Sequence, residues 1–158
     1  MRPIPAPIGL QLTQASRAVG RAFDDVLAAA GGSLPVWLVL LCLKTQSLAS
    51  QRELAGAMGI REATLTHHLT GMESAGLISR RRSDANRRIQ IVELTPAGDQ
   101  MFGRLRDIAM AFDRQLRRGI PAAEITALED VLGRLAANAG TPRAGAPPWT
   151  ALADTVTG

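Results

Sequence analysis

Apolar residues recur at the spacing of an amphipathic helix near the start of the chain. The residues that keep this spacing are Ile8, Leu12, Ala15, Val19, Phe23, Val26 and Ala30. They predict a first helix that ends at Gly31 and Gly32. Ser33 has the side chain of a helix N-cap, and the apolar run from Val36 to Leu43 predicts a second helix that is buried on most sides.

The middle of the chain predicts two short helices joined by a tight turn. Ser50 to Glu53 has the sequence of a capping box, and it opens a helix that Gly59 ends. The next helix is expected from about residue 62 to residue 75, with Gly76 as its left-handed end. This pair has the order and size of a helix–turn–helix, whose second helix enters the major groove of DNA in proteins that use the motif.

A two-stranded hairpin is expected directly after this pair. Strands 77–82 and 88–94 enclose a polar tip, residues 83–86, with the sequence Ser-Asp-Ala-Asn. Five arginines fall within nine residues of this hairpin, at Arg80, Arg81, Arg82, Arg87 and Arg88. A cationic hairpin after a helix–turn–helix is the layout of a winged-helix DNA-binding protein, in which the hairpin contacts phosphates and the minor groove.

Two more helices are expected after the hairpin. Thr95 and Pro96 open a long amphipathic helix that Gly119 ends, and Pro121 opens a last helix that continues to about residue 138. The apolar stripes of these helices and of the first helix have no partner in the central region. Residues from Ala139 onward are rich in glycine and proline, which is typical of a flexible tail.

The expected fold is therefore mainly α, a winged helix–turn–helix with one small β wing. Residues 33–95 would form the DNA-binding region. Residues 1–32 and 96–138 would pack together and against a second copy as a dimerisation region, and residues 139–158 would form the C-terminal tail.

Charge agrees with a nucleic-acid partner. The 158 residues carry a formal net charge of +4, and Lys44 is the one lysine among 18 basic residues. Arginine is the better planar donor to phosphates and guanine edges. A general bias toward alanine, arginine and glycine would explain the average charge without any partner, but it would not explain the local cluster in the hairpin.

Other classes of protein are disfavoured by the residues. The N-terminus has no apolar core of a signal peptide, and the run from Val36 to Leu43 is far shorter than the about 20 residues of a membrane helix. We expect a soluble, cytoplasmic protein. A single cysteine excludes an internal disulfide and a cysteine-rich zinc site. There is no glycine-rich phosphate loop, no Ser/His/Asp motif and no plausible carboxylate pair, so we expect no enzyme, no cofactor and no bound metal.

The second helix of the helix–turn–helix has a polar, largely uncharged outer face. If Leu65, Leu69 and Met72 face the core, His67 lies almost opposite them. Small and hydroxylated side chains let a helix enter the major groove, whereas bulky or acidic ones would collide with DNA or be repelled. The expected DNA contacts of the helix–turn–helix are Ser50, Gln51, Arg61, Ala63, Thr64, His67 and Thr70. The alternative is a solvated face without a partner.

Three stretches resemble the MarR (multiple-antibiotic-resistance regulator) family, namely SLASQRELAGAMGI, MESAGLISR and ANRRIQIVELTPAG. Two basic residues, five further residues, Leu-Thr, and a glycine three positions past that threonine are similar to the family's wing-to-helix signature. The resemblance covers roughly residues 10–138. It implies a winged-helix homodimer whose terminal helices form the interface. It also implies repression at pseudo-palindromic operators until a small phenolic or other anionic ligand binds.

The resemblance also assigns roles to single residues. Arg88 matches the wing arginine that enters the minor groove, and the expected wing contacts are Arg82, Asn86, Arg87 and Arg88. Asn86 stands where the family usually has aspartate, so it cannot make a charge-assisted bond that orients Arg88. Asp84 would then substitute, or the tip would be looser. Arg61 replaces the usual hydroxyl cap of the second helix, and it either reaches a phosphate or lies in solvent.

Four further residues are candidates for roles other than DNA contact. Trp37, His68 and Phe23 are candidates for a ligand pocket between the DNA-binding region and the terminal helices. Trp37 also suits a core position, and His68 suits a hydrogen-bonded site at the core edge. His67 and His68 are poor metal ligands, because adjacent helical side chains point about 100° apart. Trp149 in the tail would dock on the partner subunit or in a pocket, or remain solvated.

Two alternatives to a ligand-released repressor follow from the sequence. Cys42 could sense oxidants, although its apolar neighbours Leu41 and Leu43 favour an inert buried thiol. A winged helix can also act as a protein-interaction module that never contacts DNA. An acidic or neutral wing would favour that class, whereas this wing is strongly basic.

Overall fold

The computed structural model describes residues 6–45 and 50–140. The chain is mainly α-helical with one two-stranded antiparallel sheet, as expected. In chain order the elements are α1 (Ile8–Ala29), α2 (Leu34–Thr45), α3 (Gln51–Met58), α4 (Glu62–Ser74), β1 (Ile78–Arg82), β2 (Gln90–Leu94), α5 (Pro96–Leu116) and α6 (Ala122–Asn138). Trp149 lies outside the described residues.

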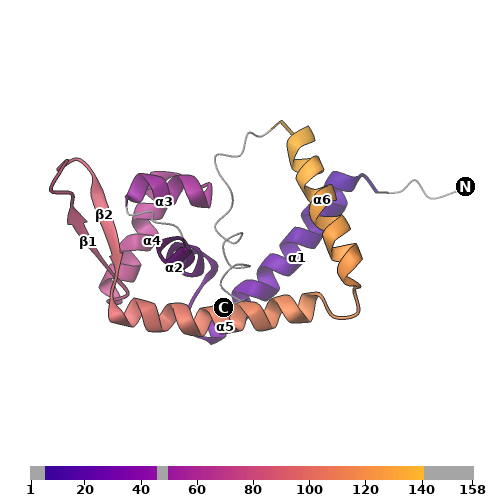
Figure 1. The fold of residues 1–158 in the computed structure, drawn as a ribbon, viewed down its shortest axis with the longest axis horizontal. Helices are drawn as coiled ribbons and strands as arrows, with labels where there is room; N and C mark the ends of the chain where they lie inside the picture. Colours follow the sequence, from indigo (N-terminus) through magenta and orange to yellow (C-terminus); the bar gives the residue numbers. More distant parts are fainter. Residues whose placement is uncertain (1–5, 46–49, 141–158) are drawn as a thin grey trace, which may run out of the picture.

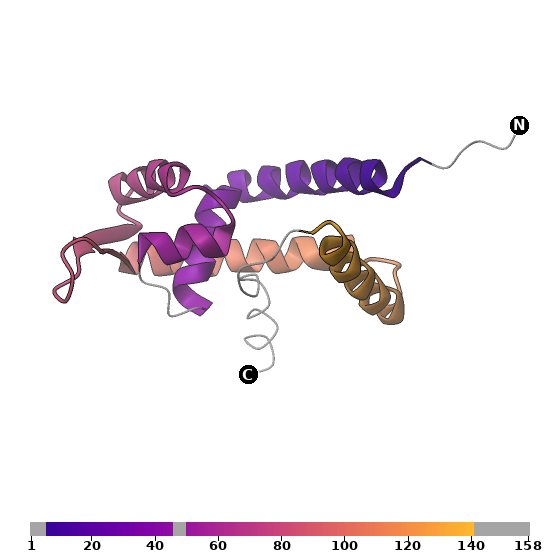
Figure 2. The same cartoon turned by 90° about the horizontal axis from the view of Figure 1, so that it is seen from above.

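Helix α5 connects the two ends of the molecule (Figure 1). At one end α2, α3 and α4 gather above it, and the hairpin β1–β2 projects outward. At the other end lies α6, and α1 extends toward it (Figures 1 and 2). The expected helix–turn–helix and wing are therefore adjacent, and both lie away from the α6 end.

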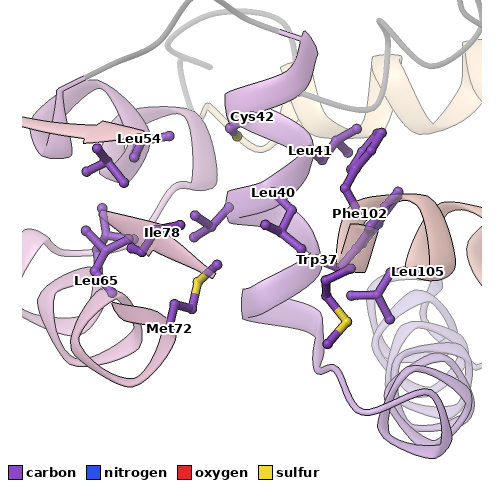
Figure 3. Close-up of a cluster of buried hydrophobic side chains, with 14 of the residues drawn as sticks. Trp37, Leu40, Leu41, Cys42, Leu54, Leu65, Met72, Ile78, Phe102 and Leu105 are labelled. Atoms are coloured by element: carbon purple, nitrogen blue, oxygen red, sulfur yellow. The ribbon is translucent and has the colours of Figure 1, made fainter. Parts of the chain in front are cut away.

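The core surrounds α2, the most apolar helix of the chain. On one side of it lie Leu54 of α3, Leu65 of α4 and Ile78 of β1, and on the other lie Phe102 and Leu105 of α5 (Figure 3). Val39, Leu40, Leu41 and Cys42 of α2 have no exposed surface. Burial of this run on all sides explains why its sequence shows almost continuous apolar residues instead of a single stripe.

Local signals fix most helix ends. Ser50 and Glu53 form the expected capping box, with the Ser50 hydroxyl accepting from the Glu53 N–H at 3.2 Å. Gly59 and Gly76 have φ of +66° and +72°, the left-handed conformation that a side chain would disfavour. At the start of α2 the Ser33 hydroxyl accepts from the Val36 N–H at 3.4 Å, as expected of the predicted cap. The Leu34 N–H also donates to Asp24 of α1 at 2.9 Å, which was not foreseen.

Thr95 joins the wing to α5. Its hydroxyl accepts from the Gly98 N–H at 3.0 Å, which is the expected N-cap, and it donates to the Gly76 carbonyl at 2.6 Å. The Thr95 N–H donates to the Leu77 carbonyl at 3.2 Å. One residue therefore ties the end of β2, the start of β1 and the start of α5 together.

The hairpin has a longer tip than the sequence predicts. β1 pairs with β2 from Ile78 opposite Leu94 to Arg82 opposite Gln90, so the second strand begins at residue 90 instead of 88. The Ser83 N–H donates to the Ile89 carbonyl at 2.9 Å and closes a loop of seven residues, 83–89. Ser50 forms an isolated antiparallel bridge with Ile91, which joins α3 to the sheet and was not foreseen.

Helices α1 and α6 leave a large apolar surface exposed. α1 packs on α5, whereas no residue of α6 is fully buried against the part of the chain that the structure describes. The exposed apolar residues at this end of the molecule are Ile8, Leu10, Leu12, Val19, Leu116, Ile120, Leu128, Val131 and Leu132. Monomeric proteins usually expose apolar side chains singly, and this group of exposed apolar side chains is larger than that pattern gives.

Among the described residues, no helix is by itself long and apolar enough to cross a bilayer. α1 and α2, bent by 80° where they meet, pass as a pair on length and composition only. α2 is the helix at the centre of the core, and burial there accounts for its apolar sequence.

Candidate nucleic-acid interface

Helix α4 presents the outer face that the sequence predicts. Leu65, Leu69 and Met72 are at most 2% exposed and form its buried stripe. The residues expected to contact DNA from this helix, Ala63, Thr64, His67 and Thr70, are all exposed. Over its first three turns the helix therefore offers small and polar side chains to a partner, together with the acidic side chain of Glu62.

The first turn of α4 has no side-chain cap. Arg61 occupies the N-cap position with extended backbone angles, and its side chain makes no capping hydrogen bond. The first amides of the helix thus receive no side-chain hydrogen bond from Arg61, which is itself exposed. This arrangement leaves both the guanidinium and the helix N-terminus available to an anion.

Replacing Arg61 with serine is expected to separate stability from DNA affinity. A serine at this position would accept from the first-turn amides and raise the free energy of unfolding by about 1 kcal/mol. The same change would remove a cation beside the recognition helix and weaken DNA binding. Urea unfolding and a binding titration on the same variant test this. An Arg61→Ser protein that is more stable and binds DNA as tightly as wild type would show that Arg61 lies only in solvent.

Ser50 and Gln51 are largely engaged within the protein. The Ser50 hydroxyl donates to Glu53 at 2.7 Å as part of the capping box. The Gln51 side-chain NH2 group donates to the Thr66 hydroxyl of α4 at 2.5 Å, and its side-chain oxygen is buried without a hydrogen-bond partner among residues 6–45 and 50–140. These contacts hold α3 against α4 and the sheet. Contact of these two residues with DNA remains a prediction.

Thr70 is less available than the sequence suggests. Its hydroxyl donates to the Thr66 carbonyl at 2.9 Å and accepts from Arg80 at 3.3 Å. A hydroxyl has one proton to donate, so in this arrangement Thr70 has none for a base or a phosphate.

The five hairpin arginines divide into two groups. Arg80 donates to Glu73 of α4 at 2.9 and 2.5 Å. Arg81 donates to Glu93 of β2 at 3.0 Å and lies 3.8 Å from Asp84. The hydrogen bond from Arg80 lowers the pKa of Glu73, and that from Arg81 lowers the pKa of Glu93. Both carboxylates are therefore charged at neutral pH and neutralise these two arginines.

Arg82, Arg87 and Arg88 form the second group. All three are exposed, and within residues 6–45 and 50–140 none of them has a carboxylate within ion-pair distance. Together with Gln90 they line one hollow at the tip of the wing. Three unneutralised guanidinium groups around one hollow form a strong local site for a polyanion.

A second hollow lies between the wing and the helix–turn–helix. Its lining residues are Ser50, Gln51, Arg52, Glu62, Asn86, Arg88, Ile89 and Gln90. Arg88 lines both hollows, so the wing tip adjoins the start of α3 and the first residue of α4. Arg52 and Gln90 were not among the residues predicted to contact DNA. The sequence held a signal for Arg52, because it is a cationic residue directly after Gln51, a predicted contact.

Asn86 orders the wing tip by accepting hydrogen bonds from backbone N–H groups. Its side-chain oxygen accepts from the Arg88 N–H at 3.1 Å, and its carbonyl accepts from the Ile89 N–H at 2.9 Å. Asn86 thus positions Arg88 through the backbone, as an Asx turn does. The expectation that Asp84 substitutes is wrong, because its carboxylate lies beside Arg81 instead.

The candidate pocket residues are all packed side chains. Trp37 is 3% exposed and stacks on Phe102 with ring centres 5.7 Å apart. Phe23 stacks on Phe112 at 5.1 Å, and His68 is half-buried. Trp37 therefore belongs to the core, where it packs on Phe102 of α5. Among the described residues, no cluster of three or more His, Cys, Asp or Glu side chains is arranged to hold a metal.

Cys42 is fully buried, and burial raises the pKa of its thiol to about 11. Because the thiolate is the reactive form, native protein is expected to resist iodoacetamide at about pH 8 and to react only when unfolded. Mass spectrometry of alkylated protein with and without urea tests this. Prompt modification of the native chain, with loss of DNA binding, would instead support redox control through Cys42.

The fold and this face define a winged helix–turn–helix transcriptional regulator. A model of the family described as MarR matches residues 33–90. The HTH-type transcriptional regulator YdgJ of Bacillus subtilis (strain 168) is 31% identical over 133 residues, which are 84% of this chain and 79% of that protein. This chain belongs to the MarR family.

Two solved structures extend the comparison. The transcriptional regulator PA3341 is 35% identical, with a TM-score of 0.73, over 85% of this chain and 98% of that one. The transcriptional repressor CouR, bound to a 23-mer DNA duplex, is 26% identical with a TM-score of 0.75, over 82% of this chain and 92% of that one.

Proposed function

We propose that this chain is a sequence-specific DNA-binding repressor that acts as a homodimer and leaves its operator when a small ligand binds. The observation that carries the proposal is that Arg82, Arg87 and Arg88 line hollows that extend to the starts of α3 and α4. The outer side of α4 exposes Ala63, Thr64 and His67 beyond them. Cations at the wing supply binding to the backbone and minor groove, and the helix supplies base contacts. The duplex bound by CouR supports the same partner for this fold.

In this proposal residues 33–95 form the DNA-binding region. The expected contacts are Arg61, Ala63, Thr64 and His67 in the major groove and Arg82, Arg87 and Arg88 at the wing. The internal hydrogen bonds of four further residues hold these groups in place, namely Ser50, Gln51, Thr70 and Asn86. Their contact with DNA would use the donors and acceptors that these internal bonds do not occupy. Arg52 joins the set because it lines the hollow with Arg88.

The exposed apolar surface of α1 and α6 supports the homodimer. A second copy of residues 1–32 and 96–138 would bury side chains such as Ile8, Leu128 and Leu132, which are 60%, 50% and 39% exposed in one chain. Because a twofold dimer presents two recognition helices, its operator would be an inverted repeat with half-sites about one turn, roughly 34–36 Å, apart. Sedimentation of the purified chain tests the dimer.

The proposal includes release of the operator DNA when a ligand binds. Two stacked ring pairs, Trp37 with Phe102 and Phe23 with Phe112, place α5 against α2 and α1. An aromatic, anionic ligand that inserted beside either pair would shift α5 and with it the spacing of the two recognition helices. The dimer would then bind only one half-site well. The ligand would favour the released state because it binds that conformation more tightly than the DNA-bound conformation.

The test is to sequence genomic DNA fragments retained by the purified chain and to repeat the selection with candidate aromatic acids. The proposal expects enriched fragments that share an inverted repeat, and loss of retention with at least one acid. Retention without any enriched sequence would contradict specific DNA binding. A chain that retained no DNA but captured a protein partner would favour the interaction module.

A further inference from the structure

Arg80 differs from the other hairpin arginines in direction and burial. Its side chain is 14% exposed, whereas that of Arg81 is 52% exposed. It extends from β1 back to α4, and it therefore has little surface to offer to a duplex. Its charge needs another explanation than contact with DNA.

The contacts of Arg80 join the wing to the second half of α4. Its Nε and Nη2 donate to the same oxygen of Glu73 at 2.9 and 2.5 Å, and Nη2 also lies 3.3 Å from the Thr70 hydroxyl. Thr70 and Glu73 are three residues apart, so they lie on one side of the helix. The hydrogen bond from Arg80 lowers the pKa of Glu73, so the contact favours the charged carboxylate.

A second link between the same two elements lies closer to the turn. The Leu77 N–H donates to the Met72 carbonyl at 2.9 Å, just before β1 begins. The base of the hairpin is also held by the buried side chains of Ile78 and Val92 and by the bridge between Ser50 and Ile91. Arg80 adds a side-chain link from the middle of β1 to the second half of α4, and this link further restricts the angle between wing and helix.

We propose that Arg80 and Glu73 are positioning residues whose ion pair fixes the wing relative to α4, so that both can engage the same duplex. The inference rests on the proposed DNA-binding function. Specific binding needs base contacts by α4 and wing contacts at the same time, whereas non-specific binding needs only charge near phosphates. The pair should therefore affect specific binding far more than non-specific binding.

Whether Glu73→Ala weakens or strengthens DNA binding distinguishes this positioning role from two simpler roles. If Glu73 were only a negative charge near DNA, removing it would strengthen binding to every duplex. If Arg80 contacted a phosphate, losing Glu73 would free Arg80 and also strengthen binding. Only a positioning role predicts that Glu73→Ala weakens specific binding. Glu62, in the first turn of α4 and on the rim of the second hollow, provides the matched control.

The experiment compares full-length wild type with Glu73→Ala, Arg80→Ala, Arg80→Lys, the double Glu73→Ala/Arg80→Ala variant and Glu62→Ala. Two probes are used, a duplex enriched by the wild type from a random pool and a scrambled duplex of the same length. Dissociation constants are measured at several salt concentrations. Thermal unfolding confirms that each variant is folded, and alanine suits the helical position of residue 73.

The expected result is a loss on the order of tenfold on the enriched duplex for both single alanine variants, with no greater loss in the double variant. Binding to the scrambled duplex should change less than about twofold, and the salt slope should stay the same. Arg80→Lys should restore only part of the loss, because an ammonium cannot span Glu73 and Thr70 as the planar guanidinium does. Glu62→Ala should bind both duplexes more tightly.

Equal or tighter binding of the enriched duplex by Glu73→Ala would overturn the proposal. So would a lower salt slope in Arg80→Ala, since that would identify Arg80 as a phosphate contact. A random pool from which the wild type enriches no duplex would overturn the proposed function, and this inference with it, before any variant is compared.

Discussion

Replacing Arg82, Arg87 and Arg88 together with glutamine is expected to weaken operator binding by about 10²- to 10⁴-fold at physiological salt. These are the hairpin arginines without a carboxylate partner among the described residues, and they surround one hollow. A dimer would lose six such cations. The slope of log affinity against log salt should therefore fall by up to about 5, at about 0.9 for each phosphate that the variant no longer neutralises.

A matched control keeps the net charge equal. Arg104, Arg106 and Arg114 are exposed on α5 and line neither hollow, and their replacement by glutamine changes the charge by the same amount. This control should bind with nearly wild-type affinity and slope, provided sedimentation shows that it remains a dimer. Equal losses of affinity in the two triple variants would mean that overall charge, and not the wing, determines DNA affinity.

Gly98→Ala is expected to lower the free energy of unfolding by roughly 3–5 kcal/mol, a size typical of steric conflict with fixed backbone. A Cβ at this position would lie 2.0 Å from the Leu77 carbonyl oxygen and 3.1 Å from Leu94. The conflict is with backbone, which is also tied to Thr95, so relief would require α5 to move away from the sheet. Operator binding should fall in parallel, because the wing is anchored here.

Gly103→Ala in the same helix is the control. No atom lies within 4 Å of a Cβ placed there, and alanine is the better helix former by about 0.5–1 kcal/mol. This variant should be as stable as wild type or more so in urea unfolding. If both glycine variants unfold at the same urea concentration, the tight contact of Gly98 with Leu77 does not limit stability.

Signals within a few residues of one another could be predicted from the sequence. The capping box at Ser50 and Glu53, the cap at Thr95 and the left-handed ends at Gly59 and Gly76 each depend on one local turn, and the structure confirms them. The buried stripe of α4 followed from helical period alone. The glycine at position 98 was part of the family signature, and its contact with Leu77 now gives the reason.

Features that depend on distant parts of the chain could not be predicted. Asp24 caps α2 only because α1 folds back beside it, ten residues earlier in the sequence. Glu73 neutralises Arg80 only because β1 packs on α4. Glu93 neutralises Arg81 only because the register of the two strands brings these residues together. The sequence therefore indicated a basic wing, but not which of its arginines remain available to DNA.

A footprint of the protein on its enriched duplex tests the central claim most directly, namely that wing and recognition helix form one DNA-binding face. Hydroxyl-radical cleavage reports the minor groove and backbone, and methylation of guanine N7 reports the major groove. We expect two protected major-groove segments about one turn apart, each next to a protected minor-groove segment, and Arg88→Ala should lose only the latter. Protection of the major groove alone by wild type, or protection that Arg88→Ala leaves intact, would contradict the account.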